Sequence, residues 1–243
     1  MHSSSLHYLP PFFGILVLLF ALVIAVLQIG ILGYAYEKMG ISRLAAYAIL
    51  FFSLVGGSVN IPVAEVGGET VVAMQEVVDN WGFRYEVPVY KQWPRTMIAI
   101  NVGGALIPTV LSIYFIVKNR IYASSALGVF AVTAVVHALA QPIPQMGISV
   151  PVFIPPVVSA LVAILLSREH AAPLAYASGC LGTLIGADLL NLDELGHLGA
   201  SVASIGGAGT FDGVFLTGIL AVLLAGSPRI SRPSNDSPTA ESA

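Results

Sequence analysis

The chain has 243 residues, of which 56% are hydrophobic and only 9% are charged. A soluble domain carries about 25% charged residues, so this composition excludes an ordinary soluble protein and predicts a polytopic membrane protein. The formal net charge of -3, from 10 basic and 13 acidic residues, leaves no basic excess for binding nucleic acid. The one cysteine, Cys180, excludes an internal disulfide and a cysteine-based metal site.

Seven stretches are apolar and long enough, at about 20 residues, to cross a bilayer as helices. The first is too long for a cleaved signal peptide and no basic residue precedes it, so we expect it in the mature protein. Prolines predict an irregular start for the fifth, and glycines interrupt the seventh. The predicted fold is an all-α membrane domain, residues 1–226, with spans at 12–36, 41–60, 96–117, 121–141, 150–167, 171–191 and 200–226.

The positions of lysine and arginine orient these spans, because basic residues accumulate on the cytoplasmic side. With the N-terminus outside, seven basic residues face the cytoplasm and three face the exterior. The inner residues are Lys38, Arg43, Lys118, Arg120, Arg168, Arg229 and Arg232, and the outer ones are Arg84, Lys91 and Arg95. We therefore expect the N-terminus outside and the C-terminus inside, with a disordered cytoplasmic tail at 227–243.

The outer loop, residues 61–95, is the longest predicted segment between spans. Two segments rich in valine and tyrosine, 69–78 and 83–90, are joined by the polar sequence DNWG, which predicts a β-hairpin. Aromatic residues in this loop are typical of an anchoring belt at the membrane surface. They are Trp81, Tyr85, Tyr90 and Trp93.

Two pairs of spans share short sequence patterns. SLVGGS at 53–58 parallels TLIGAD at 183–188, and NVGGA at 101–105 parallels SIGGA at 204–208. Both matched pairs cross the bilayer in the same direction, which predicts a parallel repeat of the kind found in some transporters. The plan is 3+1+3, with units at about 12–117 and 150–226 and a linker helix at about 121–141. The alternative is chance recurrence of small residues that let membrane helices pack closely.

Ionisable residues inside a membrane cost about 2.5–3.5 kcal/mol each and therefore usually mark functional sites. His137 and Asp188 each lie about 24 Å from the inner face, at 1.5 Å per residue, and so in the outer third of the bilayer. Polar residues gather near the same level, among them Gln141, Glu65 and His197. We expect a site that opens outward and binds a substrate or ion through Asp188, Asp212, His137, Asn60, Asn101 and Asn191.

Each ionisable residue of this site also has a purely structural alternative. Asp188 could cap or link helices near the interface, Asp212 could cap the start of the seventh helix, and His137 could be a satisfied packing residue. The glycine-rich run at 199–213 either lines a cavity as a broken segment or allows close helix packing.

Longer motifs at these positions are more specific. GTLIGADLLNL at 182–192, SIGGAGTFDGVFLTGILAVLLA at 204–225, NIPV at 60–63 and NVGGALIPTVLS at 101–112 resemble a prokaryotic family of integral membrane proteins of unknown function. The resemblance covers nearly the whole chain. It implies a bacterial or archaeal cytoplasmic membrane and no established activity.

A looser similarity is to intramembrane aspartic proteases, which use two membrane aspartates. Phe211-Asp212 and Gly186-Ala187-Asp188 are similar to their two motifs, in reversed order and without a glycine directly before the second aspartate.

Four functions stay open. The repeat, the broken helix and the one-sided polar site favour a small-molecule or ion-coupled transporter, in which Asp188 or Asp212 binds a cation or proton. An intramembrane hydrolase would use these two residues as a dyad that shares a proton. A metal site with His137 lacks any HExxH-like spacing, so we expect neither a metal nor another cofactor. The last alternative is a membrane scaffold or accessory protein.

Overall fold

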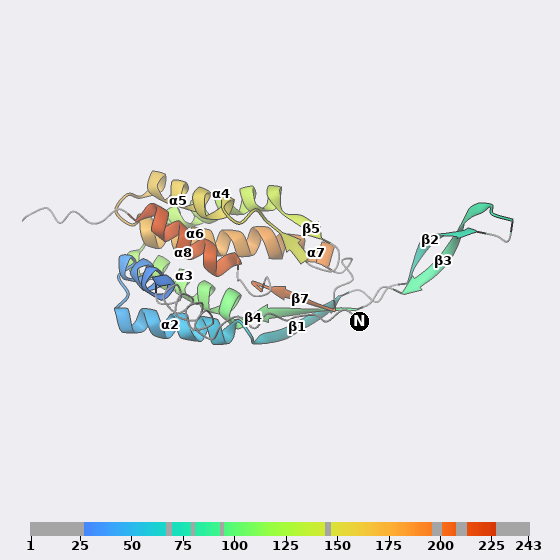
Figure 1. Cartoon of the computed structure of the whole chain (residues 1–243). Coiled ribbons are helices and arrows are strands. Elements are labelled where there is room, and N and C mark those ends of the chain that lie inside the picture. Colours follow the sequence, from blue (N-terminus) through green and yellow to red (C-terminus); the bar gives the residue numbers. More distant parts are fainter. Residues whose placement is uncertain are drawn as a thin grey trace, which may run out of the picture.

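The computed structural model describes residues 27–66, 70–78, 81–92, 95–143, 147–195, 201–207 and 213–226. These residues form a helical body, a small sheet at one end of it, and a hairpin that projects beyond the sheet (Figure 1). The helices are Leu27–Lys38, α2 (Arg43–Gly56), α3 (Ile107–Asn119), α4 (Tyr122–Leu139), α5 (Ile154–Leu166), α6 (Ala171–Thr183), α7 (Leu192–Leu195) and α8 (Gly213–Ala225). Two π-helical turns, η1 (Val102–Leu106) and η2 (Leu184–Asp188), adjoin α3 and α6, and a 3-10 turn, η3 (Leu189–Asn191), follows η2.

The sheet at the end of the body has three strands in the order β1-β4-β7. β1 (Asn60–Val66) runs antiparallel to β4 (Thr96–Asn101), and β4 runs parallel to β7 (Val202–Ile205). Two separate hairpins complete the strands. They are β2 (Thr70–Val78) with β3 (Arg84–Gln92), and β5 (Gln141–Ile143) with β6 (Gly147–Ser149).

Three helical stretches of the described chain are long and apolar enough to cross a membrane: Val102–Asn119, Tyr122–Leu139 and Ala171–Glu194. The helix Leu27–Lys38 and α2 would make a fourth span together, although a bend of 119° separates them. α5 and α8 are apolar but have 13 residues each, which rise about 20 Å. The fold is thus mostly helical, with several helices of membrane-spanning length and composition, while the seven-span topology and its orientation stay a prediction.

The structure corrects the all-α prediction at two spans. The third was expected to be helical from residue 96, but residues 96–101 form β4 and the helical backbone begins at Val102. The sequence TMIAI is rich in β-branched residues and largely buried, which suits a strand between two neighbours. Residues 202–205 of the predicted seventh span likewise form β7, and the second span ends as a helix at Gly56. Short apolar runs do not distinguish a buried strand from a helix, which explains both errors.

Parts of the predicted chain lie outside the described residues. These are residues 12–26 of the first span, residues 208–212 of the seventh, and the tail at 227–243.

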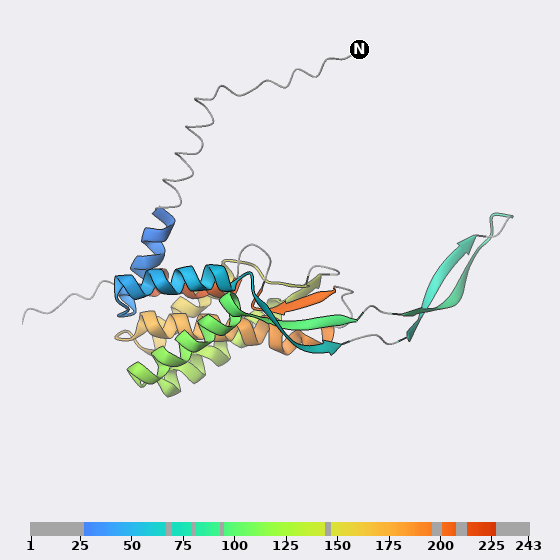
Figure 2. The same ribbon diagram turned by 90° about the horizontal axis from the view of Figure 1, so that it is seen from below.

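The hairpin predicted in the outer loop is confirmed. β2 and β3 match the predicted segments to within two residues, and Gly82 in the turn has a positive φ of 84° that favours glycine. The hairpin extends away from the body, beyond β1 and β4, in both views (Figures 1 and 2). The predicted aromatic belt stays a prediction, and its residue Trp93 lies outside the described part of the chain.

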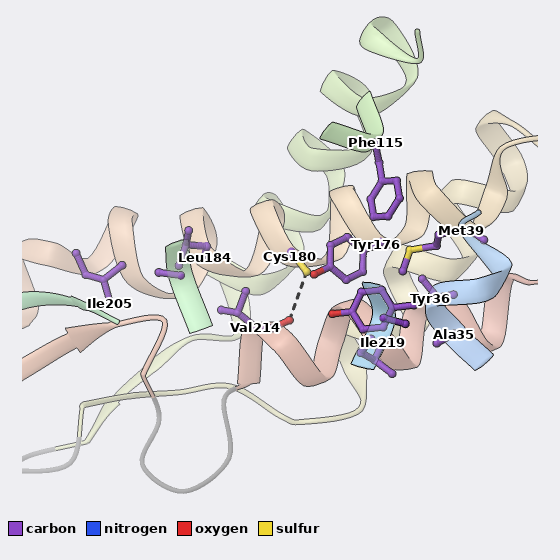
Figure 3. Packing of buried hydrophobic residues seen from close by; sticks show 14 of the residues in the cluster. Ala35, Tyr36, Met39, Phe115, Tyr176, Cys180, Leu184, Ile205, Val214 and Ile219 are labelled. Carbon is purple, nitrogen blue, oxygen red and sulfur yellow. Dashed lines mark hydrogen bonds between the residues drawn. The ribbon is translucent and has the colours of Figure 1, made fainter. Parts of the chain in front are cut away.

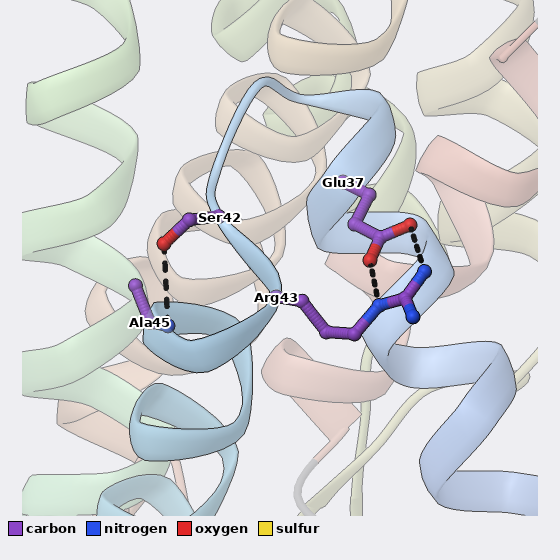
Figure 4. A network of polar contacts seen from close by, with 4 residues as sticks. All are labelled: Glu37, Ser42, Arg43 and Ala45. Atoms are coloured by element: carbon purple, nitrogen blue, oxygen red, sulfur yellow. Dashed lines mark hydrogen bonds and ion pairs between the residues drawn. The ribbon is translucent and has the colours of Figure 1, made fainter.

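A tight turn joins the helix Leu27–Lys38 to α2. Gly40 has a φ of 79°, and the Ser42 hydroxyl accepts a hydrogen bond from the Ala45 amide at 3.5 Å, which caps the first turn of α2. The Arg43 guanidinium donates to both carboxylate oxygens of Glu37, at 2.5 and 3.5 Å (Figure 4). Because this ion pair is exposed, it fixes the direction of the turn more than it stabilises the fold.

The hydrophobic core lies where the helix Leu27–Lys38, α3, α6 and α8 meet. Three buried aromatic rings pack there, with centroids 5.6 Å apart for Phe115 and Tyr176 and 6.2 Å apart for Tyr36 and Tyr176 (Figure 3). α6 is buried along nearly its whole length, which makes it the central helix of the body. The Cys180 thiol on α6 donates to the carbonyl of Val214 at 3.6 Å and so connects α6 to the first turn of α8.

Candidate functional site

The end of the sheet nearest the helices holds a group of hydrogen-bonded polar side chains, and Asn101 is its centre. Asn101 ends β4 and caps η1, because its Oδ1 accepts a hydrogen bond from the Gly104 amide at 2.8 Å. Its Nδ2 donates to the carbonyl of Gly57 at 2.8 Å and to Oδ1 of Asn60 at 3.1 Å. The side chain is buried, with the residue 4% exposed, and these three bonds fasten the end of β4 to the end of α2.

Asn60 and Ser204 extend this group across the sheet. Asn60 is the first residue of β1 and pairs with Asn101, while Ser204 lies near the end of β7. Because β4 and β7 are parallel, their carboxyl ends lie at the same edge of the sheet. The Ser204 hydroxyl donates to Oδ1 of Asn60 at 2.6 Å, although the two residues are 144 positions apart in the chain.

Asp188 joins the group from the other side. It is the last residue of η2 and half-buried, and its Oδ2 accepts a hydrogen bond from the Gly206 amide at 2.7 Å. Gly206 has a φ of 74°, and a Cβ there would lie 2.7 Å from the Cβ of Ala105, so only glycine fits this turn. Gly206 follows Ser204 by two residues, so Asp188 is bonded to the same segment of chain that carries Ser204.

Asn191 stabilises the π-helical turn that carries Asp188. Its Nδ2 donates to the carbonyls of Gly186 and Ala187 at 2.9 and 2.8 Å. A π-helical turn leaves backbone groups outside the regular helical pattern, and a side-chain amide can satisfy them. Asn191 therefore holds the end of η2 and with it the position of Asp188.

The turn η1 packs directly on the end of α2. A Cβ at Gly103 would lie 2.1 Å from the carbonyl oxygen of Ser53 and 2.4 Å from the nitrogen of Gly57, so no side chain fits there. The Ser53 hydroxyl donates to the Gly103 carbonyl at 2.9 Å. This close contact brings the two asparagines, one after α2 and one before η1, within hydrogen-bonding distance.

We call Asn60, Asn101, Ser204, Asp188 and Asn191 the polar cluster. Two of them have structural roles, because Asn101 uses both ends of its amide within the protein and Asn191 holds η2. Asn60 is exposed, and within the described residues its amide nitrogen donates to no protein acceptor. The cluster therefore contains an exposed amide donor on Asn60 and a half-buried carboxylate on Asp188, groups that suit a cation or a small polar molecule.

The polar cluster only partly matches the predicted site. Asn60 and Asn101 are hydrogen-bonded to each other, Asp188 is bonded to Gly206, and Asn191 is bonded to Gly186 and Ala187; their role as a binding site stays a prediction. His137 is exposed on α4 and makes no side-chain hydrogen bond within the described residues. The acidic partner expected from the seventh span, Asp212, lies outside those residues, so the structure does not test the dyad.

Three further polar residues were expected near the site. Glu65 forms an exposed ion pair with Arg95, at 3.7 Å, near the far end of β1 from Asn60. Gln141 is exposed in β5, and His197 lies outside the described residues. In the part of the chain that the structure describes, no group of three or more His, Cys, Asp or Glu side chains could hold a metal ion.

Ser204 is not among the predicted site residues. The alignment of NVGGA with SIGGA places Ser204 at the position of Asn101, and this is its signal in the sequence. A serine hydroxyl is common in membrane helices, so the residue type alone does not indicate a functional site.

A shallow groove of about 370 Å³ lies elsewhere, on the exposed side of α3. It shares no residue with the polar cluster, and the Lys118 ammonium lies 5.2 Å from the centre of the Tyr114 ring beside it. The lining residues are Val110, Ile113, Tyr114, Val117 and Lys118.

Comparison with known proteins gives a family and no activity. No curated protein and no solved structure matches the chain. The family described as "Protein of unknown function (DUF1614)" matches residues 54–224, well over half of the chain. The matched segment contains the whole polar cluster. The chain therefore belongs to the DUF1614 family, in agreement with the resemblance of its long motifs.

Proposed function

We propose that this protein is a membrane carrier for a small polar molecule or an ion, and that the polar cluster is its binding site. The observation that carries the proposal is the position of Asp188, whose half-buried carboxylate is bonded to Gly206, two residues after the Ser204 that bonds to Asn60. A carboxylate within a membrane protein body is costly unless it is used. π-helical turns are frequent at functional sites, and irregular backbone at membrane depth is tolerated where it is buried or lines a cavity.

The residues of the cluster have different roles in this proposal. Asp188 binds a cation or a proton, because its carboxylate is the one charge in the cluster. Asn60 binds an acceptor group of the substrate through its amide nitrogen. Asn101 and Asn191 hold these two in place, and Asp212 would add a second carboxylate from the segment before α8, as the sequence predicts.

The arrangement of the two predicted repeat units also supports a carrier. β4 leads through a glycine-containing turn into α3, and β7 leads through a glycine-rich segment to α8. The two strands lie side by side and parallel, which is the relation expected for the 3+1+3 parallel repeat. Carriers with such repeats bind their substrates at the repeat interface, and the polar cluster lies at the β4–β7 contact. The proposal places the protein in a prokaryotic cytoplasmic membrane with its N-terminus outside.

The test is transport by the full chain in lipid vesicles, with internal dyes that report protons, Na⁺ and K⁺ and with radiolabelled solutes. Gradients of protons, Na⁺ and K⁺ are imposed in turn, with and without a panel of small polar solutes. Asp188→Asn removes the charge but keeps an oxygen that accepts the hydrogen bond from Gly206. Glu194→Gln is the matched control, because Glu194 is an exposed acid on α7, six residues further along.

We expect cation- or proton-dependent flux in the wild type, a loss of at least about tenfold in Asp188→Asn, and no loss in Glu194→Gln. Equal flux in the wild type and Asp188→Asn would remove Asp188 from the site. Absence of flux for all three ions and all solutes would refute the carrier. Cleavage of membrane peptides that Asp188→Asn abolishes would favour the hydrolase instead.

A further inference from the structure

The hairpin β2–β3 is isolated from the rest of the molecule. Its strands pair over nine residue pairs, Thr70–Gln92 to Val78–Arg84, with no shift of register. In Figures 1 and 2 it stands beyond the β1-β4-β7 sheet, away from all helices. A two-stranded hairpin alone is marginally stable in water, and a stable sheet needs three or more strands or a packed face. The hairpin therefore lacks the third strand or packed face that would make it stable in water.

One face of this hairpin is exposed and carries both apolar and charged side chains. Residues directly opposite each other point to the same face, so Val72, Met74, Glu76 and Val78 share a face with Arg84, Glu86 and Tyr90. Met74 is 67% exposed and Tyr90 is 81% exposed. The hairpin lies beyond β1 and β4, on the far side of the sheet from the helical body, and so outside a bilayer that surrounds the helices (Figures 1 and 2).

The two free edges of the hairpin differ in character. β3 contains Pro88, which has no N–H to donate, and the charged residues Arg84 and Glu86. Proline and charge are the features by which natural proteins block pairing at an exposed edge. β2, with the sequence TVVAMQEVV, contains no proline and one charge, Glu76. The edge of β2 is therefore the one open to another strand.

The sequence of β2 is compatible with pairing to itself. An antiparallel pair centred on Met74 aligns all nine residues of both strands. It places Glu76 opposite Val72 of the other copy, so the two Glu76 carboxylates never face each other. A pair centred on Glu76 would instead place like charges directly opposite, which is destabilising, and would leave residues unpaired.

We propose that β2 pairs with β2 of a second copy of this chain, in the register centred on Met74, to form a four-stranded sheet in the order β3-β2-β2-β3. The sheet joins two copies outside the membrane through a two-fold axis, the commonest symmetry of oligomers. The proposal does not depend on the carrier function.

The test is disulfide cross-linking of the full chain in its own membrane. Wild type is the silent control, because its one cysteine, Cys180, is buried. Met74→Cys places two cysteines opposite each other on the two-fold axis and is expected to give a cross-linked dimer. Tyr90→Cys is the matched control, since it is equally accessible on the same face but lies on the outer strand and is expected to stay monomeric. Val72→Cys and Glu76→Cys are expected to cross-link only when co-expressed.

Charge reversal tests the same register without cysteine in the interface. Val72→Glu places two glutamate pairs across the contact and is expected to weaken dimerisation about tenfold. Adding Glu76→Lys converts both pairs to opposite charges and is expected to restore the dimer. The residues are exposed, so the melting temperature of the body is the check that both variants fold. Equal cross-linking of Met74→Cys and Tyr90→Cys, or none with Met74→Cys, overturns the proposal, as does a chain that is monomeric or that dimerises without β2.

Discussion

Replacing Asn101 by alanine tests whether one side chain holds the sheet to the helical body. The amide makes three hydrogen bonds and is buried. Each intramolecular hydrogen bond contributes about 0.5–1.5 kcal/mol, and a buried group left without a partner costs about 1–3 kcal/mol. The Gly104 amide and the Gly57 carbonyl would both lose their bonds to this side chain. We therefore expect Asn101→Ala to lower the free energy of unfolding by about 3–5 kcal/mol.

For a chain of this size each kcal/mol moves the melting temperature by about 2–4 °C, so the expected fall is about 10 °C. Trp81 lies in the turn between β2 and β3, so its fluorescence would not report on the body. The better probe is a thiol-reactive dye, because Cys180 is 1% exposed in the core and reacts only when the body opens.

The matched control is Asn60→Ala. Asn60 is exposed, and its loss still leaves Asn101 bonded to Gly57 and Gly104, so a fall of about 3 °C is expected. If Asn101→Ala melts within about 2 °C of the wild type, the three bonds do not hold the sheet in place and the reasoning fails.

Two further substitutions test close contacts of the backbone. At Gly218 a Cβ would lie 2.3 Å from the sulfur of Cys180, so Gly218→Ala should push α6 away from α8 and lower the free energy of unfolding by about 1–3 kcal/mol. Adding Cys180→Ala should recover most of this stability, as measured by thermal melting in detergent with circular dichroism. A double variant that melts no higher than Gly218→Ala would contradict this packing. Gly206→Ala forces a left-handed backbone, at about 1–2 kcal/mol, and should reduce ion-dependent flux in the vesicle assay along with stability. Full flux together with lowered stability would show that the turn at Gly206 has no role in ion binding.

The sequence predicts most helices because their apolar segments are long. Predicted spans at 121–141, 150–167 and 171–191 agree closely with α4, α5 and the α6–η3 segment. The errors fall at β4 and β7, which are short, apolar and bordered by a helix or a glycine-rich segment. Hydropathy measures burial and gives no information on strand partners, so it assigned both strands to neighbouring helices.

For the polar cluster too, some features of single residues can be predicted from the sequence and others cannot. Depth along a helix can be counted from sequence, and this placed His137 and Asp188 at one level. The side of a helix to which a residue points, relative to the core, cannot be derived from the sequence without knowing which helices pack against it. His137 follows the buried Val136 by one residue, or about 100° of rotation, and points to the exposed side. One partner of Asp188 is the backbone amide of Gly206, which leaves no signal in residue type.

The parallel pairing of β4 with β7 has a consequence for the order of synthesis. The two strands are about a hundred residues apart, with α3, α4, α5 and α6 between them. Closing such a long-range contact is slow, and it must wait until the ribosome has delivered residue 205. The bond between Ser204 and Asn60 is therefore among the last to form. Until then the nascent chain exposes the Asn60 end of its sheet, because the strand that supplies Ser204 has not yet been made.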